Sequence, residues 1–173
     1  MYHKPRPLFT IPIINKTMNE LFFLAYTDQL TQCYNRNMLE EFRKDISDED
    51  TTSLFVTIVD IDGLKWINDS EGHLAGDACI KWVASRLIPR AGIVFRLGGD
   101  EFLLLDHEPI VLDNIRNISY GSVEKQVKET LAQAMHRADT LMYNQKRYKN
   151  NRMEKGPLYV NRIKDERISD TPE

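Results

Sequence analysis

The sequence predicts an α/β sandwich in which helices flank a central mixed sheet. The expected elements run helix, helix, strand, helix, three strands and helix along the chain. Residues 54–62 are almost continuously apolar, which is typical of a central strand covered on both faces. Gly98 and Gly99 separate two further apolar runs and predict a tight hairpin. A chain of 173 residues can form one domain with a substantial core.

Two helices are expected before the central strand. The first covers residues 15–26 and the second residues 37–45, with an acidic loop at 47–52. The apolar side chains that share one face of the first helix are Met18, Leu21, Phe22 and Ala25. Three prolines within residues 1–13 predict an extended lead-in.

The central strand is expected to end at Gly63, and residues 69–77 to form a polar connection. A helix then follows as far as Pro89. Its expected core stripe consists of Ala75, Cys79, Val83 and Leu87.

The second half of the chain begins with hairpin strands at 92–97 and 100–106. A weaker strand at 115–120 and a long helix at 122–148 complete the expected fold. The stripe expected to face the core from this helix is Val127, Leu131, Ala134, Ala138 and Leu141. The polar tail contains a short candidate strand at 158–163.

Composition excludes several classes of protein. A net charge of −3 gives no broad basic surface, which argues against nucleic-acid binding. Cys33 and Cys79 form no CxxC motif and are expected to be reduced packing residues. The apolar stretches at 8–14 and 21–26 fall short of the roughly 20 residues that a membrane span needs. With no signal peptide evident, we expect a cytoplasmic location.

Two acidic clusters are the candidate metal ligands. Asp100 and Glu101 follow the paired glycines, where carboxylates suit a hard cation such as Mg²⁺, although an isolated turn of this kind is more often simply solvated. Asp60 and Asp62 share one face at the end of the central strand. Either they emerge into solvent or, because buried carboxylates need a partner, they are paired or bind a metal. If this strand pairs with the hairpin, Asp60 and Asp100 converge on one cation that could neutralise a triphosphate.

The segment after the central strand supplies candidate nucleotide-binding groups. Gly63 permits close approach of a phosphate, and Lys65 offers a positive point charge. Asn68 and Asp77 together provide the donors and acceptors that a guanine edge requires. Taken singly, a loop Asn usually forms a turn and a residue such as His73 is usually structural, so the argument depends on their clustering.

These residues together resemble the GGDEF family, the diguanylate cyclases, over about residues 20–150. The resemblance rests on four motifs in order: Asp28-x-Leu30-Thr31 with Asn35-Arg36; Asp60-Ile61-Asp62-x-x-Lys65-x-x-Asn68-Asp69-x-x-Gly72-His73-x-x-Gly76-Asp77; Arg96-x-Gly98-Gly99-Asp100-Glu101-Phe102; and Ala138-Asp139-x-x-Met142-Tyr143-x-x-Lys146. It implies a fold similar to the polymerase palm and the adenylate cyclase core. It also implies a lead-in at 1–19, a cyclase domain at 20–152 and a polar tail at 153–173.

The resemblance further implies a reaction in which two GTP molecules condense to cyclic di-GMP and two pyrophosphates. Asp60, Asp100 and the carbonyl of Ile61 would bind Mg²⁺ or Mn²⁺. Asp100 or Glu101 would help to activate the 3′-hydroxyl, and Lys65 would stabilise charge in the transition state. Each subunit of such an enzyme holds one GTP, so catalysis would require a homodimer.

The remaining implied roles concern the nucleotide. Contacts with guanine would come from Asn68, His73 and Asp77. The β- and γ-phosphates would be held by the backbone at Gly63 and Leu64 and by the side chain of Lys146. The family pattern continues with an arginine where this chain has Asn150, which removes a bidentate donor. The residues that could substitute are Lys149, Arg147 and Arg152.

Three further departures bear on regulation and on the core. Residues 106–114 are too short for the helix that the family has there, so one face of the sheet could be exposed or covered by the N-terminal segment or a partner. Residues 89–92 lack the Arg-x-x-Asp motif, so we expect no product inhibition at that position. No sensor domain is evident upstream, which leaves oligomerisation, an unknown regulatory partner or expression level as the expected means of control.

Alternatives to an active cyclase remain open at this point. The missing arginine and the missing helix favour a module that binds GTP as a regulator without turnover. A related nucleotide cyclase or polymerase is disfavoured by Asp77, because a carboxylate there suits guanine rather than adenine. A hairpin that only docks a protein partner is the least favoured alternative.

Overall fold

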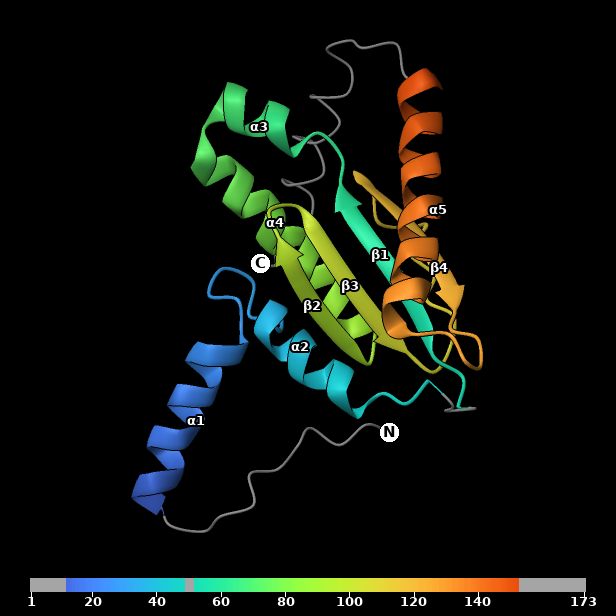
Figure 1. The fold of residues 1–173 in the computed structure, drawn as a ribbon. Coiled ribbons are helices and arrows are strands. Elements are labelled where there is room, and N and C mark those ends of the chain that lie inside the picture. Colours follow the sequence, from blue (N-terminus) through green and yellow to red (C-terminus); the bar gives the residue numbers. More distant parts are fainter. Residues whose placement is uncertain (1–11, 49–51, 153–173) are drawn as a thin grey trace.

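The structure is a computed structural model, and it describes residues 12–48 and 52–152. Within these ranges five α-helices, one short 3₁₀ helix and four strands follow one another (Figure 1). Their bounds are α1 Pro12–Tyr26, α2 Arg36–Asp45, β1 Phe55–Ile61, α3 Leu64–Glu71, α4 His73–Leu87, η1 Ile88–Arg90, β2 Ile93–Gly98, β3 Glu101–Asp106, β4 Ile118–Glu124 and α5 Leu131–Arg152. The candidate strand at 158–163 lies outside the described residues.

The four strands form one sheet in the order β2-β3-β1-β4, and each neighbouring pair is antiparallel. A parallel pairing occurs as an isolated bridge between Tyr34 and Phe95. The near-continuous apolar strand is central, as expected, and Val56 and Val59 are completely buried on its opposite faces. Gly98 and Gly99 form the hairpin turn with φ values of 143° and 52°, which explains why glycine is needed there. The predicted α/β sandwich is confirmed.

Helices cover both faces of this sheet (Figure 1). On one face α3 and α4 pack against the sheet, and the largest buried side chains there include Ile61, Ile67, Leu87, Phe102 and Leu104. On the other face lie α2 and α5, and the core includes Leu39, Phe95, Leu103, Leu131 and Ala138. Residues alternate between the two cores along β1, which places Asp60 on the α5 face.

The prediction of a polar connection at residues 69–77 is wrong, because most of this segment is helical. Gly63 takes a left-handed conformation with φ 77° and begins α3, whose Leu64 and Ile67 are buried one turn apart. Gly72, with φ 87°, is the short corner between α3 and α4. Polar residues on the outer faces of both helices made the segment resemble a loop.

The predicted start of the helix expected at 122–148 is also wrong. Residues 118–124 form β4 and pair with the whole length of β1, so α5 begins only at Leu131. Of the expected stripe, Val127 and Leu141 are about half exposed, and Met142 takes the core position instead. The ladder with β1 outweighs the weak strand propensity of a segment that contains Gly121.

The shortened segment after β3 packs its own apolar side chains into the core. Its side chains Ile110, Leu112 and Ile115 are buried in the same core as α3 and α4. The expectation that this face is exposed is therefore wrong where these side chains lie, whereas cover by the N-terminal segment or a partner stays a prediction. Three apolar side chains at close spacing fill the volume without a helix.

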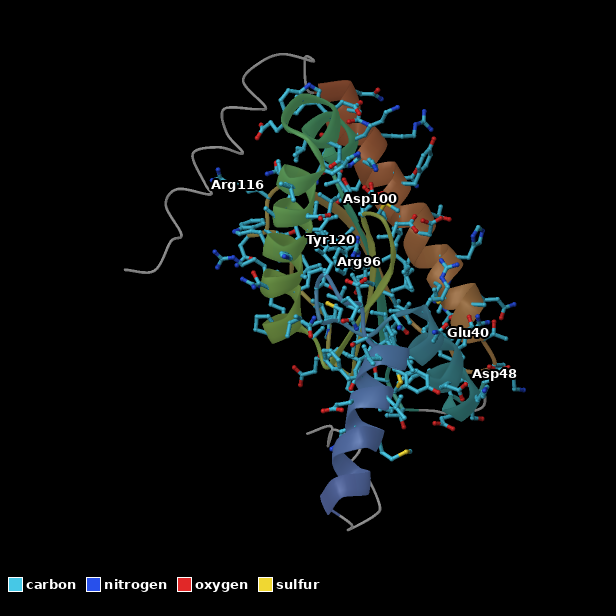
Figure 2. All side chains as sticks on the ribbon, turned by 90° about the vertical axis from the view of Figure 1, so that its left-hand side faces the viewer. Glu40, Asp48, Arg96, Asp100, Arg116 and Tyr120 are labelled. Atoms are coloured by element: carbon cyan, nitrogen blue, oxygen red, sulfur yellow. The ribbon has the colours of Figure 1, made fainter. Side chains whose placement is uncertain are left out.

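Helix α1 extends away from the sheet in both views (Figures 1 and 2). Its large apolar side chains with more than two-fifths of their surface exposed are Met18, Leu21, Phe22, Phe23 and Leu24. Among the described residues, no helix is both long and apolar enough to span a bilayer. Cys33 and Cys79 are buried and form no disulfide, as expected for reduced packing residues.

Candidate functional site

The end of β1 and the tip of the β2–β3 hairpin meet at one edge of the sheet. Asp60 pairs with Glu101 across the β1–β3 ladder. The backbone N–H of Ile61 donates to the carbonyl of Asp100 over 3.1 Å, which continues the pairing to the turn. The expected pairing of the central strand with the hairpin is therefore confirmed, and it brings the backbones of the two acidic clusters together.

Two lysines on the last turns of α5 reach the carboxylates at and just beyond the end of β1. The Nζ of Lys146 lies 2.5 Å from Oδ1 of Asp60. The Nζ of Lys149 lies 3.2 Å from Oδ2 of Asp62 and also donates to the carbonyl of Ile118. Because Lys146 and Lys149 are three residues apart on one helix, both can face the same strand.

Burial dominates the electrostatics of this edge. It raises the pKa of Asp60 above its ordinary value in spite of the hydrogen bond from Lys146, and the charges of Asp100 and Asp62 act in the same direction as burial. Burial opposes the charge on Lys146, but the hydrogen bond and charge of Asp60 outweigh it and raise the lysine pKa. The site thus contains a buried carboxylate that lies near two other acidic residues and is paired with one lysine.

The carboxylates of this edge are oxygen donors of the kind that a hard divalent cation prefers. Within the described ranges, no group of three or more His, Cys, Asp or Glu side chains is arranged to hold a metal. Mg²⁺ is commonly bound by only one or two carboxylates, with substrate phosphates and water completing its coordination. Asp60 and Asp100, whose charges influence one another, are the candidates for such a pair.

The candidate nucleotide-binding residues lie on α3 and α4. Lys65 is exposed on α3, and His73 is exposed at the first position of α4. No contact in the described part of the chain joins either side chain to the carboxylates. Asn68 and Asp77, in contrast, come from neighbouring turns of the two helices, because Asn68 lies directly against Gly76.

Sequence reasoning assigned no role to Arg96, although it belongs to the hairpin motif. Its Nη1 lies 3.0 and 3.1 Å from the two carboxylate oxygens of Asp28, and its Nη2 donates to the carbonyl of Gly99 over 2.7 Å. Asp28 also accepts from the backbone N–H and hydroxyl of Thr31. Figure 2 shows Arg96 and Asp100 between α4 and α5. The segment after α1 is thus tied to the turn that carries Asp100.

Stability should fall at acid pH partly through this contact. Burial opposes ionisation of Asp28, but hydrogen bonds from Thr31 and Arg96 outweigh it and lower its pKa below 3.8. A lowered folded-state pKa contributes stability that is complete above the unfolded value and is lost as pH falls through the folded value. We expect Asp28→Asn to lower the free energy of unfolding by about 1–3 kcal/mol near pH 7, and by less as the pH falls below 4. Urea unfolding of both proteins from pH 7 to 2.5 measures this difference, and a pH-independent difference would contradict it.

Comparison of the sequence with known protein families identifies the family of this chain. Residues 25–114, just over half of the chain, match the family described as "Diguanylate cyclase, GGDEF domain". The chain belongs to the GGDEF family. The match includes α2, β1, α3, α4 and the hairpin, and hence both acidic clusters.

Curated relatives of this GGDEF protein carry cyclase names. It is 38% identical over 97 residues to the probable diguanylate cyclase DgcF of Escherichia coli K12, an alignment covering 54% of this chain and 31% of the relative. It is 40% identical over 87 residues to the diguanylate cyclase DgcP of Pseudomonas aeruginosa, covering 47% of this chain and 13% of the relative. The chain therefore spans less than a third of the length of these relatives.

A solved structure agrees with the fold. The GGDEF domain of DgcB from Caulobacter crescentus, determined in complex with c-di-GMP, superposes with a TM-score of 0.62 at 27% identity. The alignment covers 72% of this chain and 89% of that domain.

Proposed function

We propose that this GGDEF protein is a diguanylate cyclase that condenses two GTP molecules into cyclic di-GMP and two pyrophosphates. The observation that carries the proposal is the meeting of Asp60, Asp100 and Lys146 at one sheet edge. The names of the relatives and the c-di-GMP bound to the related domain support it. We further propose residues 20–152 as the catalytic domain, with a cytoplasmic location because GTP is the substrate.

The carboxylates of Asp60 and Asp100, with the carbonyl of Ile61, would hold Mg²⁺ or Mn²⁺. When bound, this cation would neutralise the triphosphate and polarise the α-phosphorus. Asp100 or Glu101 would accept the proton of the attacking 3′-hydroxyl. Each attack forms one phosphodiester bond and releases one pyrophosphate, so two attacks close the ring.

The nucleotide itself would be held by groups on both sides of the edge. Asp77 would accept from the guanine N1–H and amino group, and Asn68 and His73 would make further contacts with the nucleotide. The phosphates would lie against the backbone of Gly63 and Leu64. Lys65 would stabilise charge in the transition state.

Lys146, which is paired with Asp60 in this structure, would bind the β- and γ-phosphates. Lys149 would remain near Asp62 and would supply part of the positive charge lost with the arginine that Asn150 replaces. Each domain holds one set of these groups, so we propose that two copies face each other during the reaction.

A product assay tests the proposal. Purified protein at high concentration, incubated with GTP and Mg²⁺ or Mn²⁺, should yield cyclic di-GMP and pyrophosphate in a ratio of one to two by chromatography. EDTA should stop the reaction, and specific activity should rise with protein concentration because two copies are required. Absence of cyclic di-GMP at the highest concentration would refute the cyclase assignment. ATP, CTP and UTP in parallel would reveal a cyclase of different specificity.

A second function, GTP binding as a regulator without turnover, is favoured by one observation. Lys146, proposed to bind the phosphates, and Lys149, proposed to supply charge near them, are ion-paired with Asp60 and Asp62. Asn150 also removes the bidentate donor beside them. Calorimetry that detects GTP binding in a protein that forms no product would support this function. Turnover in the assay above would refute it.

A further inference from the structure

Gly76 lies in α4 on the side that faces α3. These two helices carry the residues proposed to contact guanine. Gly76 is buried, and its backbone is ordinary helix rather than left-handed. Glycine inside a helix costs about 1 kcal/mol relative to alanine. No backbone conformation therefore requires glycine at this position, and its presence needs a steric reason.

The side chain of Asn68 supplies that reason. A Cβ placed at position 76 would lie 1.9 Å from Oδ1 and 2.9 Å from Cγ of Asn68, well inside any real contact. The carboxamide therefore occupies the volume that a side chain at position 76 would fill. The obstructing atoms belong to the end of a rotatable side chain, so a substitution would displace the carboxamide rather than the helices.

We propose that Gly76 is a positioning residue for guanine recognition, because its missing side chain lets the Asn68 carboxamide lie against α4 next to Asp77. This inference rests on the proposed function of the site. Gly76 touches no substrate in this scheme and acts through Asn68. Alanine at position 76 should rotate the amide away from the guanine edge while the backbone of α4 gains helix propensity.

A double-mutant cycle tests this role with a GTP analogue whose methylene group between the α- and β-phosphates blocks transfer. Calorimetry in Mg²⁺ would give the dissociation constant for the wild type, Asn68→Ala, Gly76→Ala and the double variant. We expect Gly76→Ala to weaken binding about tenfold, as expected for one lost hydrogen bond to the base. The double variant should bind no more weakly than Asn68→Ala, because the group through which Gly76 acts is then already absent.

Stability measurements separate positioning from a general effect on the fold. The melting temperature of Gly76→Ala should equal or exceed that of the wild type. The matched control is Ala78→Gly, an exposed position on the same helix, which should lower the melting temperature and leave binding unchanged. If Gly76→Ala alone does not fold, the double variant must fold, because the obstructing carboxamide is gone.

The outcomes distinguish this inference from the proposed function. If the wild type binds the analogue and Gly76→Ala binds it equally well, the positioning role alone is overturned. The same holds if the losses of affinity in the two single variants add in the double variant. Failure of the wild-type protein to bind the analogue would overturn the proposed function and, with it, the inference. The side-chain amide resonance of Asn68 in the free protein gives a further check, because it should move in Gly76→Ala and not in Ala78→Gly.

Discussion

Asp100→Asn is expected to reduce formation of cyclic di-GMP by at least about 100-fold, the scale of losing one electrostatic contact in a transition state. The amide keeps the shape of the carboxylate in the Gly98–Glu101 turn but removes the charge proposed to hold the cation. Asp100 lies at the turn, and its described backbone contact uses the carbonyl rather than the side chain. The melting temperature should therefore change little. Initial rates at saturating GTP and Mg²⁺ measure the effect.

The control for Asp100→Asn is Glu108→Gln, which removes one exposed carboxylate from the loop after β3. It should leave the rate unchanged, because surface substitutions away from the site have small effects. Equal loss in both variants would indicate a general charge effect. An Asp100→Asn protein with wild-type turnover would eliminate Asp100 as a ligand or base.

Gly121→Ala is expected to produce the largest loss of stability. An added Cβ would lie 2.1 Å from the carbonyl oxygen of Ala138 and 2.5 Å from the backbone nitrogen of Met142, so α5 must move away from β4. Helix backbone cannot rotate aside as a side chain can, and overpacking of this kind costs about 3 kcal/mol. For a chain of this length the melting temperature should fall by about 10 °C. Differential scanning calorimetry gives the value.

Gly92→Ala is the matched control for Gly121→Ala. Gly92 is exposed, and a Cβ there would lie 3.4 Å from its nearest neighbour, the carbonyl oxygen of Leu105. Its melting temperature should remain within about 2 °C of the wild type. If Gly121→Ala were equally mild, α5 would not pack on β4 as closely as the structure places it.

The sequence alone determined the strong elements and the chemistry at the hairpin. Residues 54–62 could be identified as a central strand because only a strand covered on both faces accommodates such a continuous apolar run. Gly98 and Gly99 determined the turn, because two successive positive φ values exclude most other residues. The alternation of Asp60 and Asp62 placed both carboxylates on one face, where two lysines of α5 meet them.

Weak local signals explain the errors. Residues 118–124 contain glycine and two serines, so their strand state depends on pairing with β1, a neighbour far away in the chain. The polar residues on the outer face of α3 made its sequence resemble that of a loop. The burial of Ile110, Leu112 and Ile115 could not be foreseen, because three apolar residues in a loop carry no periodicity.

Tertiary structure decided the contacts between distant segments. The pairing of Arg96 with Asp28, of Lys149 with Asp62 and of Asn68 with Gly76 brings together residues on different elements. Local sequence determines turns and strand faces because those depend on φ, ψ and the alternation of neighbouring side chains. It leaves open which helix face meets which strand, since that choice depends on how the complete core packs.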